Sequence, residues 1–128
     1  MSPGPVPGLA CAAVSIDVPD PEDRKLLLLA RSSGTRSGGG DGAAVRDLDG
    51  RTYAAGAVEL PHLRLSALAL ATAMAVSSGA KGLEAAAVAT NTPHVAGADL
   101  AIVADLGGGG VPVWRGDRAG RALGRAST

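Results

Sequence analysis

The 128-residue sequence contains few residues of the kinds that usually dominate cores and metal sites: no phenylalanine, one tryptophan, one tyrosine and one cysteine. The single cysteine, Cys11, excludes an intramolecular disulfide and any zinc site built from several thiolates. Lysine plus arginine and aspartate plus glutamate both number 12, so no net charge attracts the chain to nucleic acid or to an anionic membrane. What it has instead is 26 alanines and 19 glycines, so the core of this single domain must be built largely from small side chains.

Long hydrophobic runs are also absent. The longest apolar stretch, Leu65 to Val76, has 12 residues and includes Ser66 and Thr72, whereas a membrane-spanning helix needs about 20 residues. The segment Met1 to Ala13 contains no lysine or arginine, so it lacks the positive region of a secretory signal. We therefore expect a soluble, cytoplasmic protein without a membrane partner. The excess of arginine over lysine, 10 against 2, is typical of a G+C-rich bacterial genome.

The N-terminal part of the sequence divides into three segments. Residues 1–21 hold most of the prolines, which lack an N–H and restrict the preceding residue, and this composition predicts a flexible arm. Asp20 followed by Pro21 is a favourable helix start, and the pattern predicts a helix through Arg31. Residues 32–42 are rich in glycine and predict a loop.

Strand and helix patterns alternate through the rest of the chain. The strand patterns cover residues 42–46, 51–58, 83–90 and 111–115. The helix patterns cover residues 65–78, which are apolar on nearly every face, and 97–106. The Asp49-Gly50 pair between the first two strands is typical of a tight hairpin turn. A hairpin followed by strand–helix–strand units predicts an α/β fold with a mixed sheet of about four to five strands and helices on both faces. The predicted domain spans residues 22–118, followed by a flexible, arginine-containing tail at 119–128.

Several stretches of the sequence are similar to those of a known protein family. They are Gly42-Ala-Ala-Val45, Asp49-Gly-Arg-Thr-Tyr53 leading to Val58-Glu59, Leu65 with its alanine-rich helix, Glu84 to Thr92, and Val111-Pro-Val-Trp114. With the order of elements, they make the chain resemble the small homo-oligomeric cytidine deaminases over roughly residues 22–118. The resemblance implies a three-layer α/β/α cytidine deaminase-like sandwich that assembles as a dimer or tetramer.

The same resemblance maps the zinc and catalytic positions of that family onto residues of different chemistry. The first cysteine and the catalytic glutamate correspond to Leu68 and Leu70, and the two later cysteines to Ala96 and Asp99. Zinc deaminases require a metal-bound water and a glutamate that transfers protons, and leucine offers neither a lone pair nor a proton. We therefore expect a degenerate family member with no catalytic residue at these positions, no zinc or other cofactor, and no zinc-dependent deaminase activity.

Two residues remain as candidates for ligand binding. The asparagine and glutamate that bind the ribose in the family correspond to Ala57 and Glu59, so the carboxylate of Glu59 is retained. His62 precedes the apolar helix, where a family active site would open. Imidazole and carboxylate groups can bind zinc, so a site made of His62, His94 and Asp99 is chemically conceivable. No metal-binding spacing supports such a site, and we predict no metal ligands.

Arginines recur near the C-terminus at positions 115, 118, 121 and 125. On a helix this spacing would align them on one face, where they could contact phosphate or RNA. The glycines of this segment and the absence of an aromatic residue for base stacking favour a solvated terminus, and we expect no nucleic-acid partner.

The sequence thus favours a cytidine deaminase-like protein without zinc-dependent deaminase activity. Such a protein would serve as an oligomeric scaffold, or would bind a nucleoside-like ligand or a protein partner. Two alternatives stay open. One is an enzyme of the nucleoside deaminase class with altered or residual hydrolytic chemistry, using Glu59, His62, His94 or Asp99. The other is an interaction protein that acts through its termini.

Overall fold

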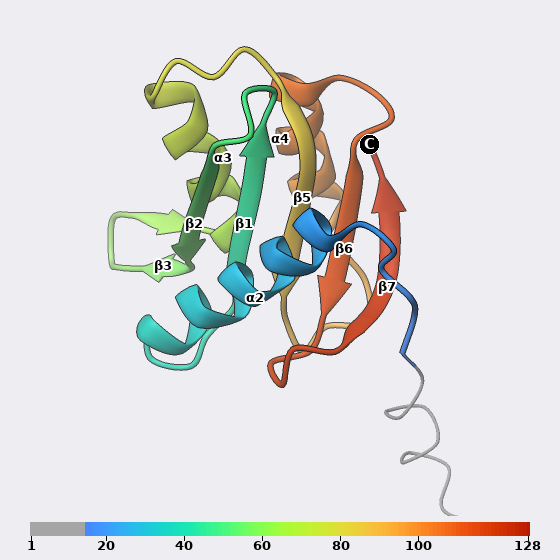
Figure 1. Ribbon diagram of the computed structural model, residues 1–128. Helices are drawn as coiled ribbons and strands as arrows, with labels where there is room; N and C mark the ends of the chain where they lie inside the picture. Colours follow the sequence, from blue (N-terminus) through green and yellow to red (C-terminus); the bar gives the residue numbers. More distant parts are fainter. Residues whose placement is uncertain (1–14) are drawn as a thin grey trace, which may run out of the picture.

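A computed structural model of the chain describes residues 15–128. The helices are α2 (Pro21–Arg36), α3 (Ala67–Ser77) and α4 (Gly97–Gly107). The main sheet contains β1 (Gly42–Asp47), β2 (Thr52–Gly56), β5 (Leu83–Ala89), β6 (Pro112–Gly116) and β7 (Ala122–Ser127). Two short strands, β3 (Val58–Glu59) and β4 (Arg64–Leu65), pair separately. Helix α2 lies on one side of the main sheet, with α3 and α4 on the other (Figure 1).

The main sheet has the strand order β2-β1-β5-β6-β7. Strand β1 pairs antiparallel with both β2 and β5, and β6 pairs antiparallel with β7. The pair β5–β6 is parallel, and α4 makes the connection between its two strands, as parallel neighbours require. The predicted α/β class and the mixed sheet with helices on both faces are confirmed.

Alternating residues of the strands divide the core into two halves. On β1, Ala43 and Val45 pack with α3 and α4, whereas Ala44 packs with α2. The small side chains allow a close approach of helix and sheet: a Cβ at Gly42 would collide with the carbonyl oxygen of Ala30 in α2. The abundance of glycine and alanine is therefore used in packing.

Helix α2 begins as predicted and ends later than predicted. The Asp20 carboxylate accepts a hydrogen bond from the Glu22 N–H at 2.9 Å, which caps the helix. The predicted loop at residues 32–42 is wrong in its first half, because the helix continues to Arg36. Position 34 of the helix requires glycine, because a Cβ there would lie 2.6 Å from the Gly40 carbonyl oxygen. The helix ends just before Gly38 and Gly39, whose φ angles are +95° and +88°.

The two ends of the described chain differ from the sequence prediction. The predicted flexible tail at 119–128 is wrong for Ala122–Ser127, which form strand β7 and pair with β6. Residues 15–21 are not a free arm either, since Val18 is buried and the Ile16 N–H donates to the Ala122 carbonyl oxygen. Composition alone suggested flexibility in both places, and backbone pairing at the sheet edge overrides it. The remainder of the predicted arm, with Cys11, lies outside the described residues.

The predicted strand at 51–58 is divided in two. Strand β2 ends at Gly56, and the Ala57 N–H donates to the Asp41 carbonyl oxygen rather than to a strand partner. The chain then enters the small β3–β4 hairpin, which lies beside β2 (Figure 1). Across residues 15–128, no helix combines the length and apolar character needed to cross a membrane.

Candidate functional site

The N-termini of α3 and α4 are joined by one short hydrogen bond. Ser66 caps α3 by accepting from the Ala69 N–H at 3.1 Å, and its hydroxyl donates to Asp99 Oδ1 at 2.6 Å. Asp99 lies in the first turn of α4, whose N-cap residue Ala96 makes no side-chain cap. Helix N-termini carry partial positive charge, so one carboxylate is stabilised by both helices. This is the place to which the sequence resemblance assigned the zinc and catalytic positions; Ser66 was missed there because a lone serine carries no motif.

The other side chains at this place have no polar atoms. Leu68 is 0% exposed and packs in the core, with the half-buried Leu70 against the same cluster. Ala96 is exposed. Among residues 15–128, no three His, Cys, Asp or Glu side chains form a group that could hold a metal ion. His62, His94 and Asp99 are therefore not brought together as a metal site, and the donor set does not fit zinc.

Glu59 and His62 lie on the small hairpin next to this place. Glu59 is exposed on β3, and His62 is exposed in the turn that the Leu60 N–H closes by donating to the Leu63 carbonyl oxygen at 2.8 Å. Leu60 and Leu63 are themselves 54% and 48% exposed. Within residues 15–128, neither the Glu59 carboxylate nor the His62 ring has a hydrogen-bond or ion-pair partner. Both side chains are thus accessible to an external ligand.

A polar network that sequence reasoning missed lies at the carboxyl end of β5. The hydroxyl of Thr90, a buried residue, donates to Asp41 Oδ2 at 2.9 Å, and Arg118 Nη2 pairs with Asp41 Oδ1 at 3.1 Å. Thr90 also lies 3.2 Å, oxygen to oxygen, from the hydroxyl of Thr92. The network ties the segment before β1 to the β6–β7 turn. The sequence signal was two threonines directly after a buried strand.

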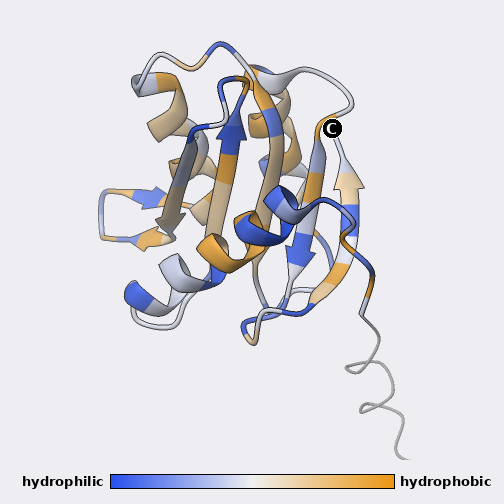
Figure 2. Cartoon of the chain, in the orientation of Figure 1, coloured by the Kyte–Doolittle hydropathy of each residue, from blue (hydrophilic) through white to orange (hydrophobic). Residues whose placement is uncertain are grey.

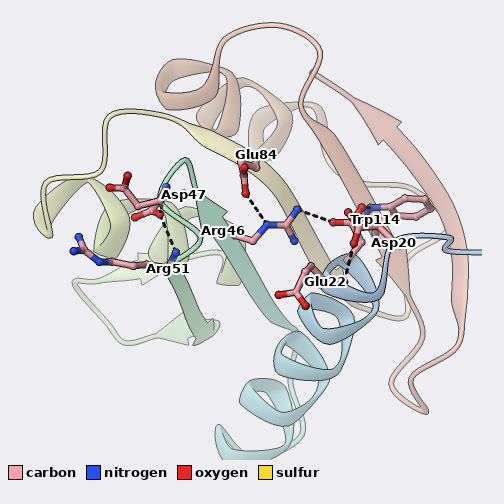
Figure 3. A network of polar contacts seen from close by, with 9 residues as sticks. Asp20, Glu22, Arg46, Asp47, Arg51, Glu84 and Trp114 are labelled. Carbon is pink, nitrogen blue, oxygen red and sulfur yellow. Dashed lines mark hydrogen bonds and ion pairs between the residues drawn. The ribbon is translucent and has the colours of Figure 1, made fainter.

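A buried ionic network lies on the α2 side of the sheet (Figure 3). Arg46 Nη2 is 2.9 Å from Asp23 Oδ1, and Arg46 Nε is 2.9 Å from Glu84 Oε1. The indole N–H of Trp114 donates to Asp23 Oδ2 at 3.0 Å. Burial alone would lower the pKa of Arg46, but the hydrogen bonds and charges of the two carboxylates outweigh it and raise that pKa. Because Asp23 and Arg46 are buried, the network fixes α2 to the sheet and is closed to ligands.

A second buried carboxylate, Asp47, organises the β1–β2 turn. It accepts from the N–H groups of Asp49 and Arg51 and from the hydroxyl of Tyr53, each at 2.9 Å. Burial would raise the pKa of Asp47, but these hydrogen bonds together hold it below its ordinary value. The hydrogen bond to Asp47 raises the pKa of Tyr53. Every contact of Asp47 is explained by the turn, so it is not a candidate for chemistry.

An apolar groove of about 520 Å³ runs between α3 and α4 on the outer surface. It is lined mainly by Ala69, Ala73, Val76, Ile102 and Leu106. No residue of α3 is charged, and the helix is coloured without the strong blue of charged side chains (Figure 2). Met74 and Val76 are 37% and 55% exposed. Within residues 15–128 this apolar surface is left open to solvent.

Comparison with known proteins finds a matching family model and several solved structures of the same fold. A family model described as cytidine deaminase-like matches residues 19–120. Cytidine deaminase from Burkholderia pseudomallei is 23% identical over 81% of this chain and 89% of that chain, with a TM-score of 0.67. A mutant cytidine deaminase from Mycobacterium tuberculosis is 20% identical over 73% of this chain and 85% of that chain, with a TM-score of 0.63. The enzyme from Mycobacterium leprae is 18% identical over 87% and 94%, with a TM-score of 0.62. No curated protein sequence matches this chain.

Proposed function

The chain belongs to the cytidine deaminase-like family, and we propose that it is a member without zinc-dependent deaminase activity that serves as an oligomeric binding protein. The observation that carries the proposal is Leu68. This side chain is 0% exposed at the start of α3, where the resemblance requires a zinc ligand.

The chemistry of the site supports this reading. A zinc deaminase needs a metal-bound water and a neighbouring carboxylate that transfers protons. The four corresponding side chains supply one carboxylate, that of Asp99, and Ser66 already donates to it at 2.6 Å. Leu68 and Leu70 fill the space with aliphatic groups, which maintains packing where an empty polar pocket would leave a cavity. We therefore derive no reaction step through zinc.

The accessible candidates for ligand contact are Glu59 and His62. Each is exposed and, among residues 15–128, lacks a partner for its side chain. A carboxylate accepts hydrogen bonds from the hydroxyl groups of a sugar, and a nearby imidazole can donate or accept one. A nucleoside-like ligand is therefore the small molecule that this proposal favours, with Glu59 on its hydroxyl groups.

The groove between α3 and α4 supports the oligomeric part of the proposal. A helix that is apolar on nearly every face is normally covered on most of its surface, yet Met74 and Val76 are exposed. The resemblance implies a dimer or tetramer. Assembly through this surface would cover these side chains.

The alternative in which the termini alone carry the interactions finds less support. Residues 122–127 form β7, which pairs with β6, and the Ile16 N–H donates a hydrogen bond to β7. Residues 122–127 and the segment around Ile16 are therefore both part of the folded domain.

The test is a measurement of zinc per chain by elemental mass spectrometry on the untagged protein, with cytidine deaminase from Burkholderia pseudomallei as the positive control. We expect almost no zinc and no loss of cytidine absorbance over time. A ratio of about one zinc per chain, or measurable turnover, would overturn the proposal and direct attention to His62, His94 and Asp99.

The ligand part is tested by titrating cytidine into the wild-type protein and into Glu59→Gln, followed by calorimetry. The proposal expects binding to wild type that is weakened about ten-fold in the variant. His94→Gln is the control, because His94 lies on a different loop. Equal affinity of wild type and Glu59→Gln would remove Glu59 from the site.

A further inference from the structure

The arginines at the C-terminal end of the chain do not share one helix face, because β6 and β7 place them on a hairpin. Two of them have carboxylate partners: Arg118 pairs with Asp41 at 3.1 Å, and Arg121 pairs with Asp117 at 3.3 Å. The guanidinium carbon of Arg125 lies 5.6 Å from the centre of the Trp114 ring, a cation–π contact. Each of these three guanidinium groups therefore has a charged or aromatic contact within the fold.

Arg115 is different from these three. Its Nη1 and Nη2 atoms lie 3.4 Å from the Thr92 carbonyl oxygen and 3.5 Å from the Leu123 carbonyl oxygen, at the long limit for hydrogen bonds. Residues 15–128 offer it neither a carboxylate nor an aromatic ring. A guanidinium has five donors in a fork that matches an oxyanion, so most of the donor capacity of Arg115 is unused.

Gly124 on β7 makes room for this guanidinium. Arg115 and Gly124 are opposite each other in the β6–β7 register. A Cβ at position 124 would lie 3.0 Å from Arg115 Nη2, so the guanidinium lies directly across the glycine. A Cβ at this position would make the guanidinium move by a few tenths of an ångström.

A cleft of about 270 Å³ is lined by Arg115, by residues 93–95 of the loop before α4, and by Gly124, Arg125 and Ala126 of β7. The cleft is at the carboxyl ends of the parallel strands β5 and β6, which is where open α/β sheets bind ligands. Helix α4 begins two residues after Val95 without a side-chain cap, so its positive end lies close in sequence to the cleft wall. The side chain of His94, which lines the same cleft, is exposed.

We propose that Arg115 and His94 form a binding site for the phosphate group of a small phosphorylated molecule. The site adjoins the degenerate zinc positions, since Val95 directly precedes Ala96, but it uses none of those four residues, nor Glu59, and its test does not depend on the function proposed above. The guanidinium fork favours a tetrahedral oxyanion, and the cleft volume suits one phosphate with a small body. A nucleic-acid strand fits less well, because Trp114 is buried and cannot stack on a base.

The experiment is a titration of ¹⁵N-labelled protein with inorganic phosphate and with phenyl phosphate, followed by amide chemical shifts. We expect saturable shifts at residues 93–95, 115 and 124, with a dissociation constant on the order of 1 mM. Arg115→Gln should weaken binding about ten-fold or more, because a charge-assisted hydrogen-bonding fork is lost. Gly124→Ala keeps every charge and should weaken binding less than Arg115→Gln, because a Cβ there makes the guanidinium shift by only a few tenths of an ångström.

Arg121→Gln is the matched control, since it removes the same charge from the same hairpin, where Arg121 pairs with Asp117 and does not line the cleft. Binding should change less than about two-fold in this variant. Absence of saturable shifts in wild type, unchanged affinity in Arg115→Gln, or equal losses in the two arginine variants would each overturn the proposal. A single-stranded oligonucleotide that binds more tightly than phenyl phosphate, with affinity rising with its length, would also overturn it in favour of nucleic acid.

Discussion

On the α2 side of the sheet, two buried charges, Asp23 and Arg46, form an ion pair at 2.9 Å, and Trp114 donates a further hydrogen bond to the pair. On the α3–α4 side, the fully buried residue Leu68 is aliphatic. The buried charged residue on that side is Asp47, at the end of β1, where it accepts a hydrogen bond from Tyr53. The same sheet therefore separates a face that buries an ion pair from a face whose buried side chains are aliphatic apart from polar residues such as Asp47 and Thr72.

The difference shows which polar groups this fold can retain inside. Asp23 and Arg46 supply charges and donors to each other, and Asp47 receives three hydrogen bonds from neutral donors. A metal site on the α3–α4 side would need several ligands and a metal at the same time, since each polar ligand alone is costly to bury. At position 68 a fully buried leucine packs into this cluster instead, and a leucine side chain needs no polar partner.

The largest expected effect is on the aliphatic side. Leu68→Ala removes a side chain that is 0% exposed and should lower the free energy of unfolding by about 4 kcal/mol, because a cavity remains. Urea denaturation followed by circular dichroism measures the loss. Leu70→Ala, at a half-buried position, should lose about half as much. A loss below about 1 kcal/mol for Leu68→Ala would contradict the assignment of this position to the core.

The next effect tests the ionic side. Arg46→Met leaves the buried carboxylate of Asp23 without its cation and should cost about 3 kcal/mol of unfolding free energy. Glu84→Gln changes the other end of the network, where the side chain is 44% exposed, and should cost less than about 1 kcal/mol. The same urea titrations compare them. Equal losses of unfolding free energy in the two variants would mean that burial does not make the Arg46–Asp23 pair more important than the Arg46–Glu84 pair.

A smaller effect belongs to the junction of α3 and α4. Ser66→Ala removes the N-cap of α3 together with the hydrogen bond to Asp99, and the expected cost is about 1 kcal/mol. Ser77→Ala, at the exposed end of the same helix, is the control and should stay within about 0.5 kcal/mol of wild type. Thermal unfolding of the three proteins checks both values. Identical behaviour of the two serine variants would show that the cap contributes nothing.

The smallest effect depends on pH. Asp47→Asn preserves the shape, and the Tyr53 hydroxyl can accept from the new amide as readily as it donated to the carboxylate. The pKa of Asp47 is held below its ordinary value of about 3.9, so its ionised form stabilises the fold above that pH. The stabilisation is lost as the pH falls through the folded-state pKa. Wild type should therefore exceed the variant in stability at pH 7, and the gap should close in acid-unfolding curves below about pH 4. A gap that stays constant with pH would exclude the ionised carboxylate as its cause.

Much of the fold could be predicted from sequence pattern because the signals were local. The Asp20–Pro21 start of α2, the Asp49-Gly50 turn and the apolar strand at Leu83–Ala89 all appear as expected. The predictions failed where a distant partner decides the structure. Residues 122–127 lack a strong strand pattern and become ordered by pairing with β6.

The features of the candidate sites also divide into those that residue types show and those that depend on distant contacts. Substitution at Leu68, Leu70 and Ala96 is visible in the sequence, because the residue types alone exclude metal ligation there. The hydrogen bond between Ser66 and Asp99 spans two helices and could not be read from either one. The four C-terminal arginines look equivalent as a series. In the structure two of them pair with carboxylates, Arg125 lies over the Trp114 ring, and Arg115 contacts only backbone carbonyls beside a cleft.

By itself, then, the sequence determined most element types and the residue types at the positions that correspond to the family's zinc site. Backbone propensity, turn chemistry and the functional groups of side chains are properties of residues and their near neighbours. The tertiary structure decided which charges are buried with a partner, that Arg115 contacts backbone carbonyls rather than a carboxylate, and where residues 15–21 and 122–127 are held. Those outcomes depend on contacts between residues far apart along the chain, such as Asp23 with Trp114 and Arg115 with Gly124. No local pattern encodes them.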